Sequence, residues 1–332
     1  MSTMIKRGIL IGLLLLIVSG ITIYFTIDLD SLATLGTFNI TSLLLAIVAL
    51  ALGMYFDGLR LQRLVRMGGY SLSLIAILRV IFGNYFMAML TPGASGGAVA
   101  QALILRSYHV PIGKAAPIVL VRTVFSILFL IVMLPIILVT EPIEVPYITN
   151  TQLLGISIFV VISTFMGMYL LQTRLMKRLV TWICKMMKKG NPKGWLIKLD
   201  EFNGGLSLLY ANPMQSFIVF IESALSLLFL YAIAPALMYA FTSDISIVEI
   251  LNRMILLNLI LYFAPTPGGT GVAEGLFVYL FASFVPIGTV GLVAVAWRIV
   301  AEYIPFFIGM YSVFTLYGQH IASSVSTSSE EV

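Results

Sequence analysis

The stretch Leu90–Gly97, LTPGASGG, places one proline and three glycines inside one of the most apolar parts of the chain. Proline removes a backbone donor and glycine favours non-helical conformations, so the cluster predicts a break in a membrane helix. A second stretch of the same character, Ala264–Gly271, reads APTPGGTG. The fold that we predict is built around these two breaks.

The composition indicates a membrane protein. The chain has 332 residues, of which 60% are hydrophobic and 10% are charged, and its mean hydropathy is +1.06. A soluble core of this size does not need so much apolar surface, whereas a chain surrounded by lipid does. In such a protein the net charge of +5 indicates cytoplasmic loops and not a nucleic-acid partner.

The sequence offers little for covalent or metal chemistry. A single cysteine, Cys184, cannot form an intramolecular disulfide, and His109 and His320 lie far apart in the sequence. The Walker A, G-x-S-x-G, H-E-x-x-H and C-x-x-C motifs are missing. We therefore expect no catalytic residues, no metal, no cofactor and no enzymatic activity, and ATP-driven transport would need a separate subunit.

Apolar runs predict six full spans, at 8–27, 40–56, 112–139, 153–171, 214–241 and 288–317. Basic segments stay in the cytoplasm. The N-terminus and the segments 57–72 and 172–200 are basic, whereas 28–39, 140–152 and 242–249 are acidic and belong outside. We therefore expect a plasma-membrane protein with both termini in the cytoplasm and a flexible tail at 324–332.

The segments 73–107 and 247–284 contain the two breaks. Because span 112–139 supplies the one crossing needed between 72 and 140, segment 73–107 must enter and leave on the same side. Its second arm of roughly 12 residues reaches about 18 Å, well short of the ~30 Å hydrocarbon core. We favour two re-entrant hairpins; counting the hairpins as conventional helices gives eight spans.

An internal repeat relates the two breaks. Thr91-Pro92-Gly93 recurs as Thr266-Pro267-Gly268, and the VPIG at 110–113 recurs at 285–288, each 175 positions later. Within one position of that offset, the same residue types recur in the pairs Arg79 and Arg253, Asn84 and Asn258, and Arg122 and Arg298. The halves start on opposite sides, which predicts an all-α membrane protein with inverted repeats at 1–139 and 140–323, an architecture typical of transporters.

Arg122 and Arg298 are the strongest candidates for anion binding. Each lies about ten residues into its span, roughly 15 Å deep, and charges at that depth are usually functional. The helix starts after each tip also attract anions. The alternatives are structural ion pairs, with Glu274 and Glu302 as partners of Arg298, and glycines that only permit packing.

For several other polar residues the sequence allows two alternative roles. Arg79 and Arg253 either capture headgroups or extend to the interface, and Asn84 and Asn258 cap the broken backbone or contact a ligand. Glu222 takes part in proton coupling or in packing. Asp57, Arg60, Arg63 and Arg66 follow a span, so we interpret them as an interfacial segment that faces anionic lipid.

The pattern N-x6-TPGASGG-x3-QALILR, followed by TPGGTGVAEG, resembles the lysylphosphatidylglycerol synthase transmembrane (flippase-like) family over roughly 7–318. That family includes the flippase domain of the bacterial multiple peptide resistance factor, and the resemblance implies movement of a polar lipid between leaflets. Carried over by motif position, the central site would comprise Pro92, Gly93, Gly96, Gly97, Pro267, Gly268, Gly269, Gly271 and Glu274. The aminoacyl-transferase domain of fused members is missing, so glycolipids, polyprenyl-phosphate sugars and phospholipids are substrate classes to consider.

We therefore predict a lipid flippase that binds a phosphate-containing headgroup at the two tips and at Arg122 and Arg298. One alternative is a membrane-embedded transferase with Glu274 or Glu302 as base, and another is a small-anion or solute transporter with a closed aqueous cavity. Membrane lipids are the expected partners. The sequence leaves two further partners open, a second copy of the chain in a homo-oligomer and a separate lipid-modifying enzyme.

Overall fold

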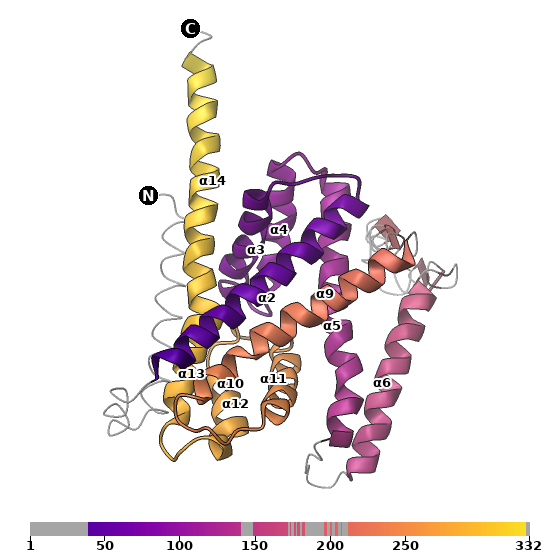
Figure 1. Ribbon diagram of the computed structural model, residues 1–332. Coiled ribbons are helices and arrows are strands. Elements are labelled where there is room, and N and C mark those ends of the chain that lie inside the picture. Colours follow the sequence, from indigo (N-terminus) through magenta and orange to yellow (C-terminus); the bar gives the residue numbers. More distant parts are fainter. Residues whose placement is uncertain are drawn as a thin grey trace.

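The computed structural model describes residues 39–140, 149–171 and 212–329, with scattered residues between 173 and 207. The predicted span 8–27 and most of the basic segment 172–200 lie outside the described residues. The regular elements of the described part are helical (Figure 1). They are α2 (Ile40–Met67), α3 (Leu74–Met89), α4 (Ser95–Ser107), α5 (Ile112–Thr140), α6 (Asn150–Leu171), α9 (Pro213–Tyr231), α10 (Ile233–Met238), α11 (Ile247–Leu261), α12 (Val272–Phe281), the 3-10 turn η2 (Ala282–Phe284), α13 (Val290–Arg298), the π-helical turn η3 (Ile299–Tyr303) and α14 (Ile304–Ser329).

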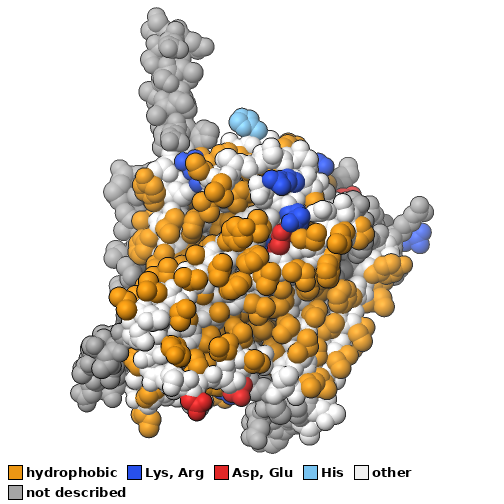
Figure 2. Space-filling view, in the orientation of Figure 1, with side chains coloured by type: hydrophobic (Ala, Val, Ile, Leu, Met, Phe, Trp, Pro, Cys, Tyr) orange, Lys and Arg blue, Asp and Glu red, His pale blue; other side chains and the backbone are white. Residues whose placement is uncertain are grey.

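Four stretches of the described chain are long and apolar enough to cross a membrane: Ile40–Met67, Ile112–Thr140, Pro213–Met238 and Val290–Leu316. The shortest has 26 residues, about 39 Å at 1.5 Å per residue, which exceeds the ~30 Å hydrocarbon core. Figure 2 shows hydrophobic side chains over a broad band of the visible face, with most Lys and Arg near its upper end and acidic groups both beside these basic groups and at the lower edge. The molecule has the surface of a multi-pass membrane protein.

The two broken segments form helical hairpins, α3 with α4 and α11 with α12. The longest of the four arms, α3, has 16 residues, about 24 Å at 1.5 Å per residue, and so falls short of the hydrocarbon core. The first hairpin occupies the upper half of the molecule and the second the lower half (Figure 1). An isolated antiparallel bridge joins Pro92 to Pro267, so the hairpins meet tip to tip.

Small residues let the long helices approach closely. α2 lies along α9 (Figure 1), and the Ser226 hydroxyl donates a 2.9 Å hydrogen bond to the Gly53 carbonyl. A Cβ on Gly53 would lie 2.7 Å from the Leu230 side chain, which is too close for a larger residue. Tight crossings of this kind are typical of membrane helices, whose association depends on packing.

The helix that contains the predicted span 40–56 is longer than that span. α2 continues past residue 56 to Met67, so the first part of 57–72 is helix. Asp57 and Arg60 are 1% and 4% exposed, which also contradicts an interfacial role for these two residues. They lie on the face of α2 that packs inward, and because they pair with each other the helix can continue with both charges buried.

At the other end of the chain, α14 extends to Ser329 and thus enters the segment 324–332, for which we predicted a flexible tail. Neither glycine nor proline occurs after Gly318, so the sequence places no helix-breaking residue there.

Candidate functional site

The two Pro-Gly tips share one backbone conformation. Gly93 and Gly268 both have a φ of 59°, and each is followed by a second residue with positive φ, Ala94 at 53° and Gly269 at 67°. Glycine adopts this region freely, whereas a residue with a Cβ pays about 1–2 kcal/mol. The Pro-Gly pair therefore turns the chain sharply between the two arms of each hairpin.

Each tip is closed by the same three hydrogen bonds, made by residues 175 positions apart. In the first tip the N–H of Ala94 donates to the Thr91 carbonyl, and both the N–H and the hydroxyl of Ser95 donate to the Pro92 carbonyl. In the second tip the N–H of Gly269 donates to the Thr266 carbonyl, and both the N–H and the hydroxyl of Thr270 donate to the Pro267 carbonyl. Because these N–H groups already bond within the tips, the donors to consider for an incoming anion are the side chains.

The tips differ at their threonines. The Thr91 hydroxyl accepts a 2.8 Å hydrogen bond from the N–H of Gly96. In the second tip the equivalent N–H, of Gly271, donates instead to Glu274 Oε2 at 2.7 Å. The Thr266 hydroxyl is buried and has no hydrogen-bond partner among the described residues. The second tip therefore holds an unused hydroxyl.

Arg122 of α5 connects α2 with the first hairpin. Its Nη2 and Nε donate to the two carboxylate oxygens of Asp57 at 2.5 and 3.1 Å. Its Nη1 donates to Gln101 of α4 at 3.0 Å, and Gln101 in turn donates to Asn84 of α3 at 2.7 Å. Bidentate Arg–carboxylate contacts are strong and directional, so the position of Arg122 is coupled to both arms of this hairpin.

The Asp57 carboxylate also binds a second arginine. Arg60 Nε lies 2.5 Å from Asp57 Oδ1, and Arg60 Nη1 donates to Ser126 at 2.8 Å. Asp57, Arg60 and Arg122 are all buried. Two guanidinium groups on one carboxylate leave a formal charge of +1 in the interior of a membrane protein, an arrangement that is costly and usually functional.

Arg298 holds the second tip. It is 2% exposed, its Nε donates to Glu274 Oε1 at 2.9 Å, and its Nη2 donates to the Gly268 carbonyl at 2.9 Å. Its Nη1 lies 3.9 Å from Glu302 Oε1 and has no hydrogen-bond partner in the described part of the chain. The π-helical turn η3 begins directly after Arg298 and contains Glu302; π turns are frequent at functional sites.

The predicted partners of Arg298, Glu274 and Glu302, are thus its ion-pair partners, as the structural alternative supposed. The other two predicted arginines brace their own hairpins. Arg79 donates to the Tyr108 hydroxyl at 2.8 Å, and Arg253 donates to the Leu280 carbonyl at 2.7 Å.

Asn258 donates to the Met254 carbonyl at 2.8 Å; both residues lie within α11, so this bond is not made to the broken backbone of the tip that one interpretation supposed. Asn84 bonds a side chain, that of Gln101. A Cβ on Gly97 would overlap the Asn84 side chain and lie 3.1 Å from Ala88 Cβ, which is the close packing that the alternative reading of the glycines supposed.

Glu222 pairs with Arg63 at 2.7 Å, a contact that the sequence did not suggest. The sequence analysis missed the polar residues Gln101, Ser126 and Thr266. It also missed that Asp57 and Arg60 point into the protein. The spacing of Asp57 and Arg60, three residues apart on a helix face that continues with Leu61 and Leu64, was the available signal.

Comparison with known proteins identifies a family and a relative. Residues 8–309 match the family model described as the lysylphosphatidylglycerol synthase TM region. The chain is also similar to a UPF0104 membrane protein of Archaeoglobus fulgidus, with 22% identity over 285 residues that cover 81% of this chain and 86% of that protein.

Proposed function

The chain belongs to the lysylphosphatidylglycerol synthase TM region family, and we propose that it moves a lipid with a phosphate-bearing headgroup between the two leaflets. The family description concerns the membrane region of a lipid-modifying enzyme, which is consistent with a lipid-related role in the membrane. In our proposal the chain itself catalyses no covalent step, and its substrate is a membrane lipid.

The observation that carries this proposal is the unused hydrogen-bonding capacity at the second tip. Arg298 Nη1 and the Thr266 hydroxyl are both buried without a hydrogen-bond partner among the described residues, and such groups normally have one. A phosphate oxygen is a strong acceptor for a guanidinium and a hydroxyl. The group formed by Asp57, Arg60 and Arg122, with its formal charge of +1, supplies positive charge next to the first hairpin.

We propose that the fold consists of six full spans and two re-entrant hairpins, in inverted repeats at 1–139 and 140–323. The repeated hydrogen bonds of the tips, their direct contact through Pro92 and Pro267 and the short hairpin arms support this arrangement. Separation of the tips toward one end or the other would expose the arginines to one leaflet at a time, which is alternating access. The protein would lie in the plasma membrane with both termini in the cytoplasm.

Reconstitution into liposomes tests the proposal. Fluorescent lipids of several headgroup classes would be placed in both leaflets, and the fraction protected from an external quencher would be followed with time. We expect the wild-type protein to move a phosphate-containing lipid, and Arg298→Gln and Arg122→Gln to slow it at least tenfold. Arg106→Gln is the matched control, because Arg106 is exposed on α4 and outside both clusters.

Two results would reject parts of this proposal. If the wild-type protein moves no lipid of any headgroup class, it is not a flippase. If lipid movement survives both arginine substitutions, the site is elsewhere. The same liposomes separate the alternatives, since a solute carrier would take up a labelled small anion and a transferase would change the mass of the lipid.

A further inference from the structure

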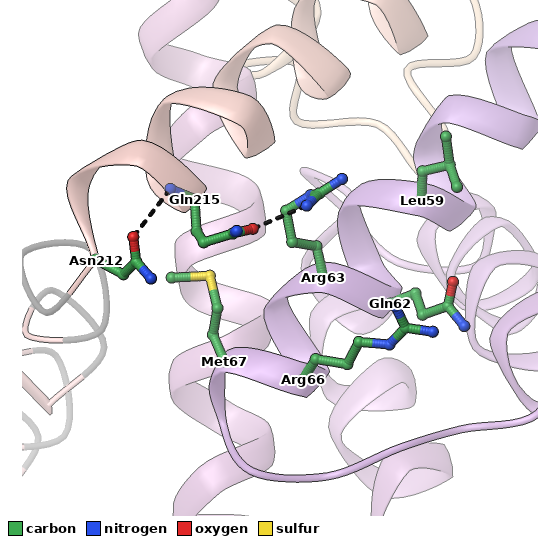
Figure 3. A pocket seen from close by; sticks show the side chains of 7 residues that line it. All are labelled: Leu59, Gln62, Arg63, Arg66, Met67, Asn212 and Gln215. Carbon is green, nitrogen blue, oxygen red and sulfur yellow. Dashed lines mark hydrogen bonds between the residues drawn. The ribbon is translucent and has the colours of Figure 1, made fainter.

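A pocket of about 420 Å³ lies between the C-terminal half of α2 and the start of α9 (Figure 3). Its lining consists of two arginines, three side-chain amides, a leucine and a methionine. None of these residues belongs to the Asp57 or Arg298 clusters. The volume is within the range of ~300–1,000 Å³ that is usual for small-ligand sites.

One arginine of the pocket is already neutralised. Arg63 Nη2 and Nε donate to Glu222 at distances of 2.7 and 3.1 Å, and its Nη1 donates to Gln215 at 2.8 Å. Asn212 caps α9, because its side-chain oxygen accepts a 3.3 Å hydrogen bond from the backbone N–H of Gln215. These contacts, drawn in part in Figure 3, line one side of the pocket with paired polar groups.

The second arginine keeps its positive charge. Arg66 is exposed and lies beside Gln62 in the pocket (Figure 3), and the lining contains no carboxylate. With Arg63 balanced by Glu222, the described lining of the pocket has a net charge of +1. A guanidinium next to side-chain amides suits a phosphate group, which accepts hydrogen bonds from both.

An apolar stripe on α2 leads to this pocket. Val48, Leu52 and Tyr55 lie 18, 14 and 11 residues before Arg66, spacings that place them within about 40° of Arg66 around a helix with 3.6 residues per turn. They are 53%, 37% and 59% exposed. One face of α2 is therefore apolar along its middle and polar at its end, a pattern that matches an amphiphile lying along the helix.

We infer that the pocket and this apolar stripe together form a groove that binds a phosphate-bearing lipid, with the phosphate at Arg66 and Gln62 and the acyl chains along Val48, Leu52 and Tyr55. The inference rests on the proposed function, because the bound lipid is the one that the protein moves. The groove holds this lipid at the surface before its headgroup reaches the tips. Binding itself can be measured without any transport.

The test is equilibrium binding of phosphatidylglycerol with a fluorescent acyl chain to the full-length protein in detergent micelles. Arg66→Gln removes a charge-assisted contact, so we expect affinity to fall about tenfold. Arg106→Gln, an equal loss of charge on an exposed residue outside the pocket, should bind as the wild type does. Inorganic phosphate should compete with the lipid only weakly, and Tyr55→Ala should weaken lipid binding without changing that competition.

Equal binding by Arg66→Gln and Arg106→Gln would overturn the inference. So would displacement of the lipid by millimolar inorganic phosphate as readily as by unlabelled lipid, because that result would indicate a site for free anions. The liposome assay keeps the two proposals apart. Arg66-dependent binding without any lipid movement refutes the transport function alone, and lipid movement with binding that does not depend on Arg66 refutes the groove alone.

Discussion

Replacement of Asp57 by asparagine would leave two buried guanidinium groups without their carboxylate. Asp57 accepts hydrogen bonds from Arg60 Nε at 2.5 Å and from Arg122 Nη2 and Nε at 2.5 and 3.1 Å. Removal of one partner of a buried ion pair costs about 3–5 kcal/mol, because the remaining charge stays buried and unpaired. Since two cations lose the same partner, we expect a loss near the upper end, about 5 kcal/mol.

Arg122→Gln should cost less. The Asp57–Arg60 pair remains in that variant, and its two charges balance each other, so the loss is that of the Arg122 hydrogen bonds, about 2–3 kcal/mol. The double variant Asp57→Asn with Arg122→Gln should be more stable than Asp57→Asn alone, because it leaves one unbalanced cation where the single variant leaves two.

The free energy of unfolding would be measured by titration with a denaturing detergent against mixed micelles, followed by circular dichroism. Arg106→Gln, on the surface of α4, is the control and should stay within about 0.5 kcal/mol of the wild type. If the free energy of unfolding of Asp57→Asn equals that of the wild type, the reasoning is refuted, because Asp57 would then lie at the water interface.

Two further substitutions test packing and a partly exposed pair. Gly97→Ala would press a Cβ against Asn84 and should destabilise by about 1–3 kcal/mol, whereas Gly113→Ala, with open space around it, should not; equal effects would contradict the close contact of α3 and α4. A double-mutant cycle on Arg63 and Glu222 should give a coupling of about 1 kcal/mol, because the arginine side chain is 32% exposed and solvent screens the pair. A coupling near zero would show that the two groups do not interact in the membrane.

Much of the fold could be predicted from hydropathy and from two short motifs. The Pro-Gly breaks identify the hairpins because proline and glycine act locally, through the backbone of the residues around them. The 175-residue offset found in the sequence also holds for the hydrogen bonds that close the tips. The end of α2 was missed because hydropathy counts Asp57 and Arg60 as polar, although the two side chains pair with each other inside the protein.

The site was harder to predict, because it depends on contacts between distant segments. Arg298 and Glu302 are four residues apart, so a helical pattern predicts that they meet. The pairs Arg122–Asp57 and Arg63–Glu222 join residues 65 and 159 positions apart, and local patterns carry no information on such pairs. The unused hydroxyl of Thr266 follows from a difference between the tips that is visible only when the bonds of both are compared.

The most direct test of the account is to lock the two tips together. The antiparallel bridge between Pro92 and Pro267 implies a Cα separation of about 4.5–5.5 Å, which is within the range for a disulfide. In a protein with Cys184→Ser, the pair Pro92→Cys and Pro267→Cys should cross-link on oxidation, stop lipid movement in liposomes and release it on reduction. Failure to cross-link would contradict the contact between the tips, and equal lipid movement by the oxidised and reduced protein would contradict alternating access by separation of the tips.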